Sequence, residues 1–117
     1  MKKLTFLIIS SLLLLSCNNE DDKIQYPECV QSIITTYTKN NPIPSKEYGR
    51  AHVDKYYYKE KTVYLIDLYP NMPDNMSSVY SENCELLCGL GGIDGNLNDC
   101  INWNEAKFIE TVWKDPR

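Results

Sequence analysis

The chain has 117 residues, of which 12 are Lys or Arg and 16 are Asp or Glu, so its formal net charge is −4. A chain of this length holds one small hydrophobic core. Its lysines are scattered along the sequence, whereas nucleic-acid binding normally requires a basic stripe. We therefore expect one folded domain and no nucleic-acid partner.

The first sixteen residues have the pattern of a secretory signal peptide. Lys2 and Lys3 supply a positive charge, and an apolar run over residues 4–15 follows directly. A helix needs about 20 apolar residues to cross a bilayer, so this run is too short for a stable span. We expect residues 1–16 to be removed from the mature protein.

The end of this run, Leu14-Leu15-Ser16-Cys17, resembles the bacterial lipobox. The resemblance implies that Cys17 is the lipidated first residue of the mature protein and that acyl chains such as palmitate hold it to the membrane. Asn18 is not the Asp associated with inner-membrane retention, so the resemblance also implies the bacterial outer membrane. The alternative is an ordinary secretory signal that leaves Cys17 as a free thiol.

Residues 17–25 are polar and acidic, which predicts a flexible tether. The cluster Glu20-Asp21-Asp22 resembles the export signal of surface-displayed lipoproteins, although acidic residues also solvate ordinary linkers. Removal of Lys2 and Lys3 leaves 10 basic against 16 acidic residues, a net charge of −6. This charge disfavours adsorption of the domain to anionic lipid, so the acyl chains alone would provide the anchor.

Lipidation of Cys17 would leave an even number of cysteines. Four remain in the folded part, and we expect them to form two disulfides in an oxidising compartment; they are Cys29, Cys84, Cys88 and Cys100. Three pairings are possible, and we favour Cys29 with Cys84 and Cys88 with Cys100. A zinc site formed by Cys84, Cys88 and Cys100 with His52 is a weaker alternative, because zinc sites usually have a short Cys-Cys knuckle on both sides and only one is present here.

An amphipathic helix and a β-hairpin are predicted next. The apolar residues Val30, Ile33, Ile34 and Tyr37 recur at helical spacing after Pro27, and Asn40-Asn41-Pro42 ends the helix. Strands over about 51–59 and 62–69 follow, joined by a tight turn at Glu60-Lys61 that lacks the usual Gly or Asn. The helix should cover the face of the second strand that carries Tyr64, Ile66 and Leu68.

The remaining residues predict short elements. We expect a loop over 70–77, a short strand at Val79-Tyr80, one helical turn over 84–88 and a Gly-rich loop over 89–95. Asn102 and Glu105 have the spacing of a capping box, and a final strand should run from Phe108 to Trp113. We therefore expect an α+β domain over residues 26–117, in which a small antiparallel sheet of three to four strands packs against one N-terminal helix and two disulfides add stability.

No residues predict an enzyme or a resident cofactor. Asp94, Asn96, Asn98 and Glu105 occupy four positions of a calcium loop, but the Gly required at the sharp turn is absent, so we expect a hydrogen-bonded turn and no metal. His52 is the single histidine, and no potential nucleophile lies at a sequence spacing from it that indicates a catalytic pair. An enzyme would need a pocket that brings His52 together with two carboxylates.

The run Tyr56-Tyr57-Tyr58 is the candidate binding element. Tyrosine offers rigid contact area, and strand alternation points Tyr57 away from its two neighbours, so at least one ring should lie outside the core. Tyr57 and Tyr58 are our candidate binding residues. Core packing is the competing explanation for these rings.

The order of motifs resembles a family of small bacterial lipoproteins of unknown function. The motifs are the Tyr-rich hairpin, the Cys84-to-Cys88 pair, the Gly91-Gly92 loop and the terminal Trp113-Lys114-Asp115. We expect a lipid-anchored, non-catalytic module that binds an envelope protein or a glycan. The alternative is a secreted inhibitor of a protease or hydrolase that presents the loop from Gly89 to Asn98.

Overall fold

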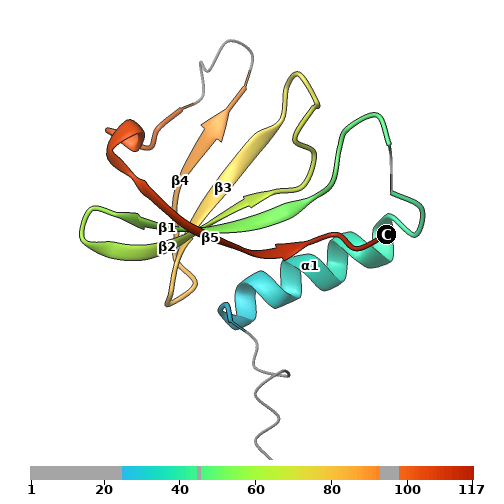
Figure 1. The fold of residues 1–117 in the computed structure, drawn as a ribbon, viewed down its shortest axis with the longest axis horizontal. Coiled ribbons are helices and arrows are strands. Elements are labelled where there is room, and N and C mark those ends of the chain that lie inside the picture. The colour runs from blue at the N-terminus through green and yellow to red at the C-terminus, as the bar shows by residue number, and fades with distance from the viewer. Residues whose placement is uncertain (1–24, 45, 93–97) are drawn as a thin grey trace, which may run out of the picture.

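The described part of the chain forms one helix packed on a five-stranded sheet. The computed structural model describes residues 25–44, 46–92 and 98–117. In chain order the elements are α1 (Glu28–Asn40), β1 (His52–Tyr58), β2 (Lys61–Asp67), β3 (Met76–Ser81), β4 (Leu86–Gly91), the 3-10 turn η3 (Trp103–Glu105) and β5 (Lys107–Lys114). The strands are antiparallel in the order β4-β3-β2-β1-β5 (Figure 1). The predicted α+β class is confirmed, with one strand more than expected.

Helix α1 covers one face of the sheet with its apolar stripe. Val30, Ile34 and Tyr37 are buried, as the helical spacing predicted. Val30 and Ile34 pack with Ile33 against a cluster on the sheet that includes Val53, Tyr64, Ile66 and Leu68. The predicted burial of the Tyr64-Ile66-Leu68 face is therefore confirmed. Within the described ranges, no helix is both long and apolar enough to cross a membrane.

The second face of the sheet is also apolar, and the segment that leads into β5 covers it. Val63 and Val79 are fully buried on this face, beside Tyr58, Cys88 and Cys100. Trp103 and Ala106, from η3 and its end, pack on the same cluster. The domain therefore has two cores, one on each side of the sheet.

Each core has its own disulfide, and the favoured pairing is confirmed. The Cys29–Cys84 bond joins the start of α1 to the turn between β3 and β4. The Cys88–Cys100 bond joins β4 to the segment that covers the second face. In the chain-entropy model, closing the 12-residue separation between Cys88 and Cys100 stabilises the fold by about 3 kcal/mol.

The region after Cys84 differs from the sequence-based expectation. We predicted a helical turn over 84–88 and a Gly-rich loop beyond it, but residues 86–91 form β4, paired with β3. Gly91 pairs with Met76 in this strand, and the position requires glycine because its φ is +122° and a Cβ atom there would collide with the carbonyl oxygen of Asn75. Strand β3 is also longer than predicted, since Met76 and Ser77 pair with β4.

The end of the chain holds the end of α1. Asp115 is buried, and its carboxylate accepts hydrogen bonds from Nε and Nη2 of Arg117 at 2.9 and 2.8 Å. Nη1 of Arg117 donates to the carbonyl oxygens of Asn41 and Pro42, just after α1. Hydrogen bonds from Arg117 hold the pKa of Asp115 below its ordinary value, against the opposing effect of burial.

This arrangement predicts acid-sensitive stability. Because the folded-state pKa of Asp115 is depressed, its carboxylate stabilises the fold above the unfolded-state pKa, about 4, and this stabilisation is lost as pH falls through the folded-state pKa. We expect Asp115→Asn to lower the free energy of unfolding at pH 7 by about 1–3 kcal/mol and to flatten its dependence on acidic pH. Urea unfolding between pH 7 and pH 3 measures both effects. The exposed control Asp74→Asn should change neither, and an equally steep acid dependence in Asp115→Asn would contradict this account.

Candidate functional site

The β1-β2 hairpin ends in a turn with unusual backbone geometry. Tyr58 pairs with Lys61, so the turn residues are Lys59 and Glu60, one position earlier than the predicted Glu60-Lys61. Their φ angles are +49° and +63°, both in the left-handed region. Two-residue hairpins favour this conformation because it matches strand twist, and they normally use Asn and Gly to adopt it. Lys and Glu adopt a left-handed backbone less readily than Asn and Gly, so the turn is strained.

This turn forms one wall of a cavity of about 280 Å³. We call it the hairpin-tip cavity, and its lining residues are Tyr57, Tyr58, Lys59, Glu60, Asn102, Glu105 and Lys107. They come from the hairpin, from the segment around η3 and from the start of β5. Asn102 also has a positive φ, +58°, so the cavity contains three of the four non-glycine residues with left-handed backbone in the described part of the chain. Strained residues of this kind concentrate at functional sites.

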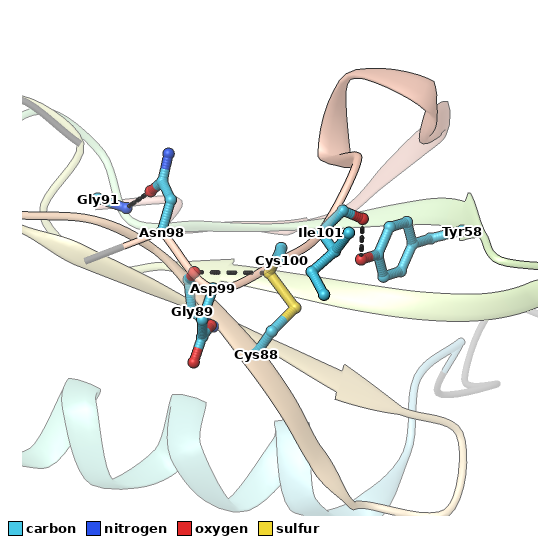
Figure 2. The surroundings of a disulfide bond; sticks show 8 residues. All are labelled: Tyr58, Cys88, Gly89, Gly91, Asn98, Asp99, Cys100 and Ile101. Atoms are coloured by element: carbon cyan, nitrogen blue, oxygen red, sulfur yellow. Dashed lines mark hydrogen bonds between the residues drawn. A yellow bond between two sulfur atoms is a disulfide. The ribbon is translucent and has the colours of Figure 1, made fainter. Parts of the chain in front are cut away.

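The two candidate tyrosines have different environments. Tyr57 is 45% exposed, whereas Tyr58 is 7% exposed. The Tyr58 hydroxyl donates to the carbonyl oxygen of Ile101 at 2.6 Å, beside the Cys88–Cys100 bond (Figure 2). The Trp103 ring packs against those of both Tyr56 and Tyr58. Tyr58 therefore supports the cavity from the core, and Tyr57 is the ring available to a ligand.

Four charged side chains line the same cavity without neutralising one another. Within the described ranges, Lys59, Glu60, Glu105 and Lys107 form no ion pair and no side-chain hydrogen bond. The Lys59 ammonium instead lies 5.2 Å from the centre of the Tyr58 ring. Together with the Asn102 amide, these groups offer both hydrogen-bond donors and acceptors beside an exposed aromatic ring. That combination suits recognition of a polar ligand.

The predicted capping box at Asn102 and Glu105 is wrong. A 3-10 turn does follow Asn102, but no side chain caps its start. The left-handed backbone of Asn102 differs from the extended conformation that an N-cap residue usually adopts. Glu105 consequently faces the hairpin-tip cavity.

Of the calcium-loop candidates, the structure describes Asn98 and Glu105, and Glu105 lines the hairpin-tip cavity. Asp94 and Asn96 lie outside the described residues, and so does the tip of the loop that the inhibitor hypothesis invokes. The Asn98 side chain accepts a hydrogen bond from the Gly91 amide, and that of Asp99 accepts from Gly89 (Figure 2). These bonds and the Cys88–Cys100 disulfide fix both ends of the loop.

His52 is remote from the hairpin-tip cavity. It lies at the other end of β1, where Nε2 is 3.5 Å from the Asp54 carboxylate and Nδ1 is 3.1 Å from the Arg50 carbonyl oxygen. The zinc alternative fails because Cys84, Cys88 and Cys100 are all in disulfides. One potential metal group occurs among the described residues, Cys88 with Asp99 and Cys100, and its two sulfurs are bonded to each other.

The fold and this surface define a small, disulfide-bonded α+β domain. Residues 39–115, about two thirds of the chain, match the model of a domain of unknown function, DUF6970. The chain therefore belongs to this family, in agreement with the expected uncharacterised class. The matched region contains every residue of the hairpin-tip cavity. No curated protein and no solved structure matches the chain.

The sequence predicted Tyr57 and Tyr58 as binding residues. It did not predict that the other five lining residues of the cavity join them in one site. Two stretches distant in sequence, residues 59–60 and 102–107, supply them, and no periodic pattern reveals such a meeting. One signal was present, because a two-residue turn without Gly or Asn indicates backbone strain. Cys17 and residues 18–24 lie outside the described residues.

The strain at the Lys59-Glu60 turn predicts that substitution by glycine stabilises the fold. We expect Glu60→Gly to raise the free energy of unfolding by about 1 kcal/mol, because glycine adopts a positive φ without steric cost. Urea unfolding followed by tryptophan fluorescence measures the change. The matched control is Glu85→Gly, at an exposed position without a positive φ, which should not gain stability. A loss of stability in both variants would contradict the assigned strain.

Proposed function

We infer that this chain is a lipid-anchored, non-catalytic binding module of the bacterial cell envelope. It holds an envelope protein or glycan at the hairpin-tip cavity. The observation that carries this proposal is the cavity itself, where the exposed Tyr57 ring lies among unpaired charged side chains on a strained backbone. The volume of about 280 Å³ is near the lower end of the range for ligand pockets, which begins at about 300 Å³.

The sequence supports the anchor. A signal-like segment ends at Cys17, the odd cysteine in a chain whose other four cysteines are paired. Two or three acyl chains on Cys17 would bind a membrane stably, which a single chain does not. The outer membrane, with display at the cell surface, is the location that the residues around Cys17 favour by resemblance.

The geometry favours binding over catalysis at this site. His52, the candidate general base, lies outside the cavity and pairs with Asp54. The lining groups are two tyrosines, an asparagine, two lysines and two glutamates, which suit hydrogen bonding and stacking.

A second candidate function draws on the loop after β4. Its two ends are fixed by the Cys88–Cys100 bond and by the side chains of Asn98 and Asp99. A loop with a fixed base is the form in which an inhibitor presents an extended segment to a hydrolase, because preorganisation lowers the entropic cost of binding.

The proposal predicts that capture of a ligand depends on Tyr57. Immobilised full-length lipoprotein should retain a protein or glycan from the solubilised envelope of its source bacterium. We expect Tyr57→Ala to reduce the retained amount about tenfold, since a central interface aromatic contributes about 1–2 kcal/mol or more. Mass spectrometry and glycan analysis of the retained material measure the effect.

Two further variants complete the experiment. Phe108→Ala removes another exposed aromatic, which packs on Tyr56, and should leave capture unchanged. Cys17→Ala should move the chain from the membrane fraction to the soluble fraction of cells. Equal capture by Tyr57→Ala and wild type would refute the binding site, and membrane retention of Cys17→Ala would refute the anchor.

A further inference from the structure

A second cavity lies beside the first, against the same hairpin. It encloses about 350 Å³ and shares Tyr58 and Lys59 with the hairpin-tip cavity. Its other lining residues are Lys61, Leu87, Cys88, Asp99 and Ile101. We call it the Leu87 cavity. The two cavities therefore lie side by side at the tip of the hairpin.

Two of the side chains that line the Leu87 cavity are aliphatic and open to solvent. Leu87 is 39% exposed and Ile101 is 66% exposed, although both are large apolar side chains. The Cys88–Cys100 disulfide and the hydrogen bond from Tyr58 to the Ile101 carbonyl hold this wall in place (Figure 2). An aliphatic side chain entering here would bury apolar surface against preformed walls.

The rim of this cavity carries a local excess of positive charge. Lys59 and Lys61 line it, and neither ammonium is paired with a carboxylate within the described ranges. The one acidic lining residue, Asp99, already accepts a hydrogen bond from the Gly89 amide. In a chain of net charge −4, this is a specific attraction for a carboxylate.

The cavity also adjoins an open sheet edge. Strand β4 is at the edge of the sheet, and Asp99 bonds to it at Gly89. Among the described residues, no neighbouring segment bonds to the outer side of β4 at Leu86 and Leu87. An extended peptide can add to such an edge while its side chains enter adjacent pockets.

We propose that the Leu87 cavity binds an acidic peptide segment of a partner protein, with an aliphatic side chain between Leu87 and Ile101 and a neighbouring carboxylate on Lys59 and Lys61. This inference rests on the proposed function, because it names the ligand chemistry at the same end of the sheet. The exposed aliphatic side chains of Leu87 and Ile101 and the open edge of β4 favour a peptide over a sugar acid.

Small probes test this chemistry by nuclear magnetic resonance on the mature disulfide-bonded chain in detergent micelles. The probes are N-acetyl-L-leucine, its neutral analogue N-acetyl-L-leucinamide and glucuronate. N-acetyl-L-leucine should shift the amide signals of Lys61, Leu87 and Ile101 and bind about threefold to fivefold more tightly than the amide, which is the range of a partly exposed ion pair. Glucuronate should bind more weakly than N-acetyl-L-leucine.

Two variants test which lining residue binds the carboxylate of the probe and which binds its aliphatic side chain. Lys61→Gln should remove the preference for the acid over the amide, whereas Leu87→Ser should weaken binding of both. The control Lys114→Gln, at the far end of β5, should leave all affinities unchanged. Equal binding of acid and amide overturns the proposal, and tighter binding of glucuronate replaces it with an acidic glycan. Either result leaves Tyr57-dependent capture standing, whereas loss of that dependence refutes the proposed function itself.

Discussion

The structure depends on closing the second apolar face of the sheet, because α1, the single α-helix among the described residues, covers only the first face. Helix α1 covers Val53, Tyr64 and Ile66, but Val63 and Val79 on the other side need a separate cover. A short segment around Trp103 provides it, and a segment of this size has too little apolar area to remain docked by itself. The Cys88–Cys100 bond, with the hydrogen bond from Tyr58 to Ile101, holds it against the sheet.

The same constraint produces the candidate site. When the Trp103 ring packs against Tyr56 and Tyr58, the residues on either side of it, Asn102 and Glu105, are brought opposite the hairpin tip. Tyr57 points to the other side of the strand from its neighbours, beyond the residues that α1 covers, and remains exposed. Binding surface and core are thus consequences of one arrangement, in which the buried rings of the hairpin position the exposed groups.

The parts of the fold that the sequence predicted are those governed by local periodicity. The stripe of Val30, Ile34 and Tyr37 identified α1, and the alternation around Tyr64 identified both β2 and its buried face. The errors fell where tertiary contacts override local preference. Gly91 suggested a loop, yet it pairs with Met76 in β4, where the backbone of Asn75 approaches too closely for any side chain. The site could be predicted only at Tyr57 and Tyr58, since the residues opposite them depend on a docking that no local pattern encodes.

Hydrogen exchange in two disulfide variants tests the central claim most directly. In Cys88→Ala/Cys100→Ala, the amides of Glu105 and Ala106, which bond within η3, should exchange at least about tenfold faster, a loss of about 1.4 kcal/mol in local stability, while the amides of α1 keep their protection. The matched variant Cys29→Ala/Cys84→Ala should show the reverse pattern. Undiminished protection of Glu105 and Ala106 without the Cys88–Cys100 bond would contradict the claim that this disulfide holds the second face closed.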